Sequence, residues 1–173
     1  MAGRFARKRD GTFAVRLVPE ERDAIRDLPE RLKEVLSSHE PRDPGLNRLF
    51  PPAVLDDDVA ARAFDELTHD DLARRRGDAA DVMAASIDSA TLTEEELTAW
   101  LSVINDTRLV LAARLELDES SQPGDFTGEA QRAFLLYRYL TDLTTQMVRA
   151  LSGITEMSLL RDVLRRERAR GTD

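Results

Sequence analysis

The sequence predicts a mainly α-helical bundle of about five helices with a small N-terminal β-hairpin. Apolar residues recur at three- and four-residue intervals through most of the 173 residues, a spacing typical of helices with one buried face. Strand-like alternation is confined to Phe13, Val15 and Leu17, directly after an Asp-Gly turn signal. At this length we expect a single helical domain over residues 1–152, followed by a basic tail over residues 153–173 that is partly helical or disordered.

The hairpin is expected over about residues 4–18, and two strand registers are open. A two-residue turn at the Asp-Gly pair would place Phe5 opposite Arg16. A three-residue loop with Gly11 in the left-handed conformation would instead pair Phe5 with Val15. Burial favours the second register, because it brings two apolar side chains onto one face. Since an isolated hairpin is marginal in water, we expect it to dock on helices.

The first helical segment is expected to begin at Pro19, because proline is favoured in the first turn of a helix. Pro29 lies inside the same apolar stripe, so we expect a kink or a restart there rather than one straight helix. The next stretch, HEPRDPGLNRLFPPAV, holds four of the seven prolines and is interpreted as a long irregular connection. Three apolar residues are expected to anchor this connection to the core: Leu46, Leu49 and Phe50.

Two further helices are expected in the middle of the chain. One begins at about Asp56, in a run of three aspartates that suits the positive end of a helix dipole, and turns Phe64 and Leu67 inward. The other begins after Thr68, which has the spacing of an N-terminal cap with Asp71 three residues on. The apolar face of this second helix is expected to consist of Leu72, Ala79, Val82, Met83 and Ile87.

The clearest helix start is the capping box of Thr93 and Glu96, and the helix that it opens is expected to reach about Leu115. A loop, DESSQPGD, separates this helix from a last one that begins near Thr127 and stops at Gly153. Both helices carry apolar residues at helical spacing. These are Leu97, Leu101, Ile104, Leu111 and Leu115 in the first helix, and Leu136, Leu140, Leu143, Met147 and Leu151 in the last.

An amide, a carboxylate and a guanidinium interrupt the first of these apolar helices, at Asn105, Asp106 and Arg108. Arg108 lies on the apolar stripe and needs an acceptor there, because burying an unpaired charge costs several kcal/mol. Asn105 can supply its amide oxygen, whereas Asp106 points to the opposite side of the helix. The carboxylate partner of Arg108 is therefore expected from another segment or subunit. One interpretation is a buried tie that fixes helix register; the other is a ligand or partner site.

Composition excludes several kinds of chemistry. The chain has no cysteine, which excludes disulfides, thiolate nucleophiles, cysteine-ligated zinc and iron–sulfur clusters. His39 and His69 are its two histidines, so we expect neither a histidine-rich metal site nor a catalytic triad, and we predict no metal and no cofactor. There is no glycine-rich phosphate loop. No apolar run is long enough to span a membrane and the N-terminus lacks a secretory signal, so a cytoplasmic location is expected.

The net charge of −8 is unevenly distributed. Residues 1–18 carry +4 and residues 161–173 carry +2, so the rest of the chain carries −14. An acidic body repels phosphates, so direct nucleic-acid binding is not expected. The basic ends are interpreted as solvated termini, and Arg74, Arg75 and Arg76 as a solvated helix face.

A phosphate or partner contact at these three arginines is the alternative, and Tyr137 is a further candidate for a partner surface. Trp100, Tyr137 and Tyr139 are too few and too helical to form a platform for stacking nucleic-acid bases, and Trp100 is expected in the core.

Several stretches of the chain resemble one family. AWLSVINDTRLVLAARLEL, residues 99–117, is similar to a tryptophan–Asn-Asp-x-Arg-Leu-Val-Leu helix of the DUF2017 proteins, an actinobacterial family of unknown function. NRLFPPAVLDDDVAARAFDELTHDDL resembles the Leu-Phe-Pro-Pro segment of that family and the helix start after it. LLYRYLTDLTTQMVRAL and GTFAVRLVPEERDAIRDLPERLKEVL fit its last helix and its N-terminal part. The resemblance covers roughly residues 5–152.

The resemblance implies a regulatory role rather than catalysis. Genes of the family often neighbour a Clp protease adaptor, and some members are described as oxidative-stress regulators that act through a sigma factor and a redox-active cysteine pair. Because this chain has no cysteine, a thiol switch is impossible here. A regulatory role would have to run through protein contacts alone.

Two functional hypotheses follow. The first is a non-enzymatic regulatory or protein-interaction protein that acts in transcription or the stress response through protein contacts, with a sigma factor or a Clp-associated component as partner and a homodimer as one assembly. The second is a small-molecule-binding protein, or an enzyme, with a pocket around Asp106 and Arg108. A cavity walled by both side chains would favour the second hypothesis.

Overall fold

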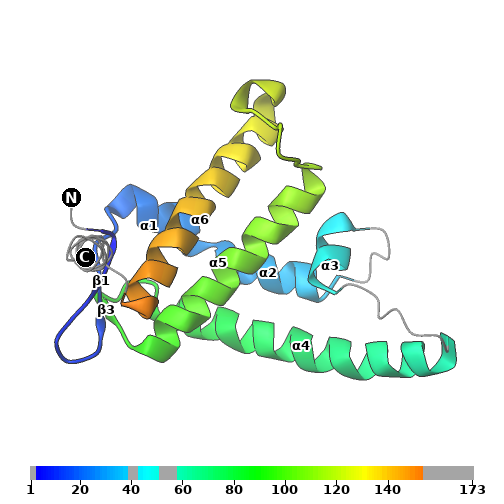
Figure 1. Cartoon of the computed structure of the whole chain (residues 1–173), viewed down its shortest axis with the longest axis horizontal. Helices are drawn as coiled ribbons and strands as arrows, with labels where there is room; N and C mark the ends of the chain where they lie inside the picture. The colour runs from blue at the N-terminus through cyan, green and yellow to red at the C-terminus, as the bar shows by residue number, and fades with distance from the viewer. Residues whose placement is uncertain (1–2, 39–42, 51–57, 154–173) are drawn as a thin grey trace, which may run out of the picture.

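The computed structural model describes residues 3–38, 43–50 and 58–153, with the backbone alone for residues 58–68. This part of the chain is mainly helical and includes a small antiparallel sheet, as the sequence predicts (Figure 1). α4 runs along the base of the molecule, while α5 and α6 rise from it side by side (Figure 1). The expected tail lies outside the described residues apart from Gly153.

The sheet consists of β1 (Phe5–Arg7), β2 (Phe13–Val15) and β3 (Thr91–Leu92) in the order β1-β2-β3. Phe5 pairs with Val15 and Gly11 has a φ of 85°, which confirms the three-residue loop and its register. The third strand was not predicted from the sequence. It is two residues long, too short to show an alternating pattern, and it forms because Phe13 finds Leu92 as its cross-strand partner.

α1 (Pro19–Arg26) ends just before α2 (Leu28–Leu36), so the expected restart near Pro29 is confirmed. α3 (Pro44–Leu49) lies within the stretch interpreted as irregular, and that interpretation is wrong at this point. The Asp43 carboxylate accepts a hydrogen bond from the Gly45 N–H at 2.8 Å, and Pro44 occupies the first helical turn. Leu49 is buried and Leu46 and Phe50 pack against the core, as expected for anchors.

α4 (Asp58–Ser86) is one continuous helix, so the prediction of two helices with Thr68 as an N-cap is wrong. No proline lies between residues 58 and 86, and Asp71 pairs with the side chains of Arg74 and Arg75 instead of capping a helix. Met83 and Ile87 are buried as expected, but Val82 is exposed, because the buried face is centred on Ala80, Met83 and Ser86. The side chains of Phe64 and Leu67 lie outside the described residues.

α5 (Glu94–Arg114) and α6 (Gly128–Ser152) form a helical hairpin, joined through the short 3₁₀ helix η1 (Pro123–Asp125). The predicted capping box is present: Thr93 Oγ1 accepts from the Glu96 N–H at 3.2 Å, and Glu96 Oε2 accepts from the Thr93 N–H at 2.7 Å. Gly153 ends α6 with a φ of 67°, as predicted. α5 packs against α2, α3, α4 and α6, which makes it the central helix.

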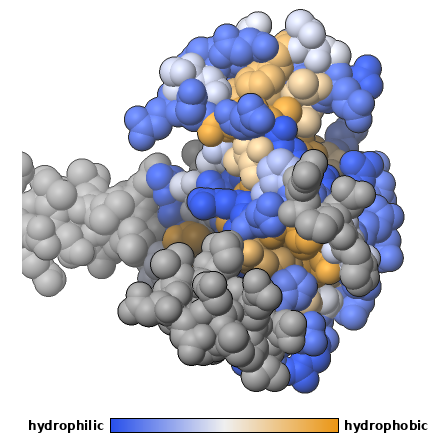
Figure 2. Space-filling view, turned by 90° about the vertical axis from the view of Figure 1, so that its right-hand side faces the viewer, coloured by the Kyte–Doolittle hydropathy of each residue, from blue (hydrophilic) through white to orange (hydrophobic). Residues whose placement is uncertain are grey.

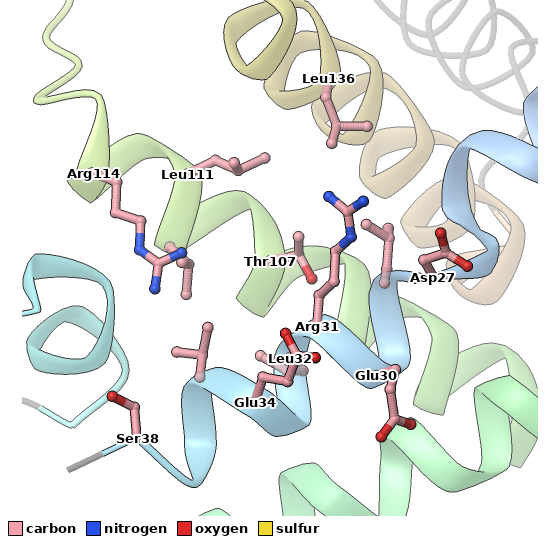
Figure 3. A pocket seen from close by; sticks show the side chains of 13 residues that line it. Asp27, Glu30, Arg31, Leu32, Glu34, Ser38, Thr107, Leu111, Arg114 and Leu136 are labelled. Atoms are coloured by element: carbon pink, nitrogen blue, oxygen red, sulfur yellow. The ribbon is translucent and has the colours of Figure 1, made fainter. Parts of the chain in front are cut away.

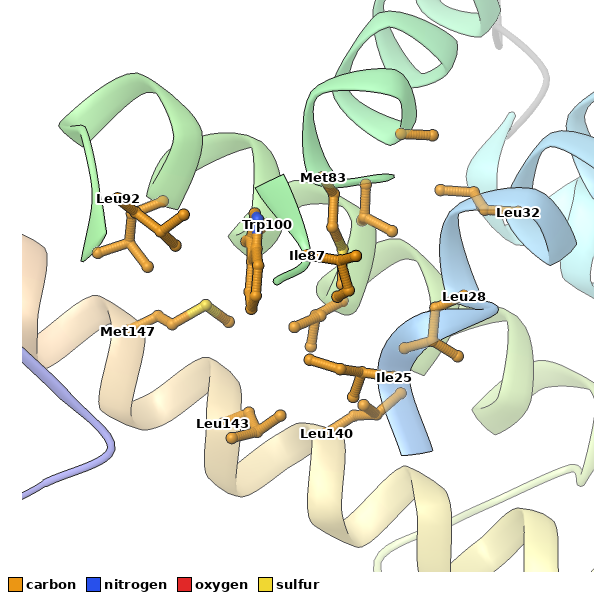
Figure 4. Close-up of a cluster of buried hydrophobic side chains, with 14 of the residues drawn as sticks. Ile25, Leu28, Leu32, Met83, Ile87, Leu92, Trp100, Leu140, Leu143 and Met147 are labelled. Atoms are coloured by element: carbon orange, nitrogen blue, oxygen red, sulfur yellow. The ribbon is translucent and has the colours of Figure 1, made fainter. Parts of the chain in front are cut away.

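The core is built around Trp100, which is fully buried as expected (Figure 4). Its indole N–H donates a hydrogen bond to Ser86 Oγ at 2.8 Å, so the polar atom of the ring is satisfied inside the core. Trp100 belongs to a cluster of apolar side chains from α1, α2, α4, the turn after α4, β3 and α6: Ile25, Leu28, Met83, Ile87, Leu92, Leu140, Leu143 and Met147 (Figure 4). The core therefore joins the sheet to the α5–α6 hairpin.

Ion pairs attach the N-terminal β-hairpin to the helices, so the basic residues near the N-terminus are not simply solvated. Arg4 Nε lies 2.6 Å from Glu21 Oε1, and Arg4 Nη1 lies 3.0 Å from Asp142 Oδ2. Arg7 Nη2 lies 3.3 Å from Glu94 Oε2.

Among the described residues, no helix has the length and apolar character needed to cross a membrane.

Candidate interaction site

The buried charge of α5 is Asp106, which is 6% exposed. Its Oδ2 accepts a hydrogen bond at 2.9 Å from Nε of Arg76, a residue of α4. The Arg76 guanidinium also lies over the ring of Phe50, 5.0 Å from its centroid. The Phe50 ring in turn packs at a tilt of 32° against the His69 ring, with 4.0 Å between the ring centroids. This cluster ties α4 and α5 together and extends to the end of α3.

Burial raises the pKa of Asp106 above its ordinary value of 3.8, although the charge and the hydrogen bond of Arg76 oppose the shift. Arg76 Nη1 is buried and has no hydrogen-bond partner among the described residues. The pair is therefore expensive to keep inside the protein. The pair links α4 to α5, and removing either partner would leave the other charge buried and unpaired.

Arg108 is not the buried charge that the apolar stripe suggests. It is half-buried, and Asn105 supplies its amide oxygen as expected, accepting from Arg108 Nη2 at 2.8 Å. Within the described part of the chain, no carboxylate lies within 4 Å of the Arg108 guanidinium, so the expected carboxylate partner is not found there. The buried face of α5 is rotated relative to the predicted stripe, because Trp100, Val103 and Val110 take the core positions.

The three consecutive arginines of α4 divide between two environments. Arg74 and Arg75 are exposed and pair with Asp71, which agrees with a solvated helix face. Arg76 does not: it turns inward to Asp106, and the expectation of a solvated face is wrong for this residue. A run of three cannot all lie on one side of a helix, since successive residues differ by about 100° around its axis.

Arg108 and Tyr137 lie together at a pocket on one side of α5. The pocket has a volume of about 280 Å³ and is also lined by Arg48, Leu109, Ala112, Ala113 and Leu117. Asp106 does not line it, because its side chain faces Arg76 on the other side of the helix. The structure therefore places Asp106 and Arg108 on different sides of α5, whereas the enzyme hypothesis requires both side chains in one cavity.

A larger groove lies on the opposite side of α5, between α2, α5 and α6 (Figure 3). Its volume is about 780 Å³. Leu111 and Leu136 face each other from the two long helices, Thr107 lies between them and α2, and the Arg31 side chain reaches up from α2 toward Leu136 (Figure 3). No pattern in the sequence indicates this groove, since its three walls lie far apart along the chain.

Charged side chains surround the apolar surfaces of the groove. Leu32, Val35 and Val110 are buried, while the α2 side bears the carboxylates of Asp27, Glu30 and Glu34. Arg114 also lines the groove, but its charge is paired, with Arg114 Nη2 2.6 Å from Asp43 Oδ2. The groove can therefore accept apolar side chains flanked by cations.

The remaining surface offers fewer candidates. On the face shown in Figure 2, the described residues are largely hydrophilic, with apolar areas near the top, where α5 and α6 are connected, and again in the lower half. Leu135 and Val148 on α6 are exposed apolar residues, at 54% and 47%. The part of the chain that the structure describes contains no group of three or more histidine, aspartate or glutamate side chains placed to hold a metal ion.

A family model described as "Domain of unknown function (DUF2017)" matches residues 2–151. No curated protein and no solved structure matches the chain.

Proposed function

The chain belongs to the DUF2017 family, and we propose that it is a non-enzymatic regulatory protein that acts by binding another protein. The observation that carries this proposal is the groove between α2, α5 and α6, whose walls are partly apolar and whose α2 side is acidic. The side chains that could have carried chemistry are engaged in structural contacts. Asp106 is bound by Arg76, and Asn105 is bound by Arg108.

The groove suits an amphipathic helix of a partner protein. Such helices insert apolar side chains at three- and four-residue spacing into a groove of this kind. Leu111 and Leu136 offer partly exposed apolar surface on facing walls, so an inserted side chain could contact both. Burial of this surface would supply the favourable free energy of binding.

The charge of the rim favours a basic partner helix. Asp27 and Glu34 outnumber Arg31, because Glu30 Oε2 already lies 3.8 Å from Lys33 Nζ and the charge of Arg114 is balanced by Asp43. The acidic body of the protein adds a longer-range attraction for cations, which speeds association. We therefore expect basic residues on the side of the partner helix that faces α2.

The family resemblance favours a partner in transcription or proteolysis. A sigma factor or a Clp-associated component is the first to test, and the readout in the cell would be the stress response. A second copy of the chain competes for the same surface and would give a homodimer. The cysteine-free sequence means that any control of the contact does not use a thiol switch.

Two neighbouring leucines provide the test. Leu136 faces the groove, whereas Leu135 is 54% exposed and does not line it. Leu136→Glu places a carboxylate inside the groove, and Leu135→Glu is the matched control on the same helix. Each form is used as bait in a native lysate, with captured proteins identified by mass spectrometry and thermal melts confirming that both variants fold.

We expect a reproducible partner with the wild type and with Leu135→Glu, and its loss with Leu136→Glu. A second variant, Glu30→Lys with Glu34→Lys, reverses charge at two exposed rim positions and should weaken the same complex without touching the core. A partner retained by both groove variants, or no reproducible partner, would contradict the proposal. Light scattering of the purified protein gives its molar mass in solution, which shows whether the chain forms a homodimer.

The small-molecule hypothesis keeps one supporting observation, and it differs from the form that the sequence suggests. Neither the groove nor the smaller pocket has both Asp106 and Arg108 in its walls, so an enzyme that uses the two together is not supported. Of these two residues, Arg108 lines the smaller pocket and Asp106 does not; Arg48 and Tyr137 line the same pocket.

A further inference from the structure

The pocket on the other side of α5 brings two guanidinium groups together. Arg48 comes from α3, Arg108 from the middle of α5, and Tyr137 from α6, so three separate elements build it. Ala112 and Ala113 contribute only methyl groups at its wall, which leaves the space of about 280 Å³ open. This pocket and the groove lie on different faces of α5 and share no lining residue.

The positive charge of the pocket is not neutralised within the described residues. Neither Arg48 nor Arg108 has a described carboxylate within 4 Å, whereas Arg26, Arg74 and Arg114 each have one. Arg108 donates one hydrogen bond, from Nη2 to the Asn105 amide oxygen. Its Nε is buried and has no hydrogen-bond partner among the described residues.

A buried donor without an acceptor costs about 1–3 kcal/mol, and two cations that face one space repel each other. An oxyanion bound between the two guanidinium groups offsets their repulsion, and it supplies Arg108 Nε with an acceptor once binding turns that atom toward the pocket. Arginine binds carboxylate and phosphate through paired N–H donors, in which Nε and one Nη act together. We propose that the Arg48–Arg108–Tyr137 pocket binds the oxyanion group, carboxylate or phosphate, of a small molecule.

The apolar walls indicate the size of the ligand. Leu109 and Leu117 line the pocket beside the Tyr137 ring, and Phe134 supports that ring with a centroid distance of 6.2 Å. Ligand pockets commonly enclose about 300–1,000 Å³, so this pocket lies just below the usual range. It therefore accommodates a small acid with a flat or branched apolar part rather than a nucleotide.

The proposal goes beyond partner binding and does not depend on it, because the two sites share no residue. It is tested on the full chain with two probes, inorganic phosphate and benzoate, and with chloride at matched ionic strength as the control. Thermal melts report binding as a saturable rise in melting temperature. Nitrogen-15 NMR of the arginine Nε–H groups reports directly whether Arg108 gains an acceptor.

We expect phosphate, benzoate or both to shift the Arg108 Nε–H resonance saturably and to raise the melting temperature beyond the effect of chloride. A response to one probe alone identifies that oxyanion class. Arg108→Gln should abolish the stabilisation and Arg48→Gln should weaken binding at least tenfold. Arg74→Gln, at an exposed arginine outside the pocket, should leave binding unchanged.

Two results would overturn the proposal. One is an equal response to chloride, phosphate and benzoate, since this would mean charge screening and not a site. The other is a saturable response that survives Arg48→Gln, which changes an exposed side chain and should not impair folding. The wild-type NMR titration remains decisive even where Arg108→Gln is unstable.

Discussion

Asp106 and Arg76 form a buried ion pair across 30 positions of sequence, with Arg76 Nε 2.9 Å from Asp106 Oδ2. The pair joins the central helix α5 to the long helix α4, and the Phe50 ring covers the guanidinium. The neighbouring Arg108, which the apolar pattern marks as the buried charge, faces a pocket instead. The two charges of one helix thus have different surroundings and predict different mutational outcomes.

Breaking the buried pair is expected to destabilise the protein. Arg76→Met strands the Asp106 carboxylate and Asp106→Leu strands the Arg76 guanidinium, so each should lower the free energy of unfolding by about 2–4 kcal/mol. The double variant removes both charges and should lose less than the two single variants together. Urea unfolding of the four proteins gives the coupling energy as a double-mutant cycle.

The control for this cycle is Arg108→Ala. This substitution removes one hydrogen bond to Asn105 from a half-buried side chain, so it should cost no more than about 1 kcal/mol. A loss at Arg108 as large as that at Arg76 would mean that the burial of the two arginines has been assigned the wrong way round.

The raised pKa of Asp106 predicts an unusual pH dependence. Burial raises it above 3.8 in the folded protein, so between the folded and unfolded pKa values the folded state binds more protons. The contribution of Asp106 to stability is therefore greatest below the unfolded pKa and declines as pH rises through the folded pKa. Relative to Asp106→Asn, the wild type should gain stability as the pH falls from 7 to 4.

The difference between the two proteins isolates this effect. Four other carboxylates have lowered pKa values because of arginine or hydroxyl partners: Asp43, Asp71, Asp88 and Asp118. Their contribution to the stability of the fold decreases as the pH falls, and it does so equally in both proteins. Urea midpoints measured across this pH range would show the trend. A difference that shrinks on acidification would mean that Arg76 outweighs burial and lowers the pKa.

The hydrogen bond inside the core can be tested through the single tryptophan. Ser86→Ala removes the acceptor of the Trp100 indole N–H and leaves a buried donor unpaired, which should cost about 1–3 kcal/mol. Trp100 is the only tryptophan in the chain, so its fluorescence follows unfolding of the core directly. An unchanged urea midpoint with an unchanged native spectrum would show that the hydrogen bond contributes nothing.

Two helical glycines should respond to alanine in opposite ways. At Gly45 an added Cβ would lie 2.7 Å from Val110 Cγ1, so Gly45→Ala should force α3 away from α5 and cost about 1–3 kcal/mol. At Gly77, inside α4, an added Cβ meets nothing within 4 Å, so Gly77→Ala should stabilise by about 0.5–1 kcal/mol. Calorimetric melts of the two variants give the comparison. If both substitutions stabilised the protein, α3 would be able to move away from α5 at little cost in free energy.

Local signals along the chain predicted much of the fold. The capping box at Thr93, the stop at Gly153 and the hairpin register at Phe5 each depend on residues close in sequence. Such signals act through the backbone of one element, so they survive without tertiary information. The prediction was wrong at Thr68, because α4 continues past this local cap signal. It also missed the start of α3, which is marked by Asp43 as the N-cap and Pro44 in the first turn.

The candidate sites depended on the packing of distant segments. The sequence by itself determined a helical protein without cysteine chemistry, and it marked Asn105, Asp106 and Arg108 as unusual in an apolar helix. Only the tertiary structure decided that Asp106 is buried against Arg76 and that Arg108 faces a pocket. The reason is geometric: periodicity gives the face of a helix to within about one residue, or 100° of rotation. Which residue at the edge of that face is buried depends on where the neighbouring helix lies.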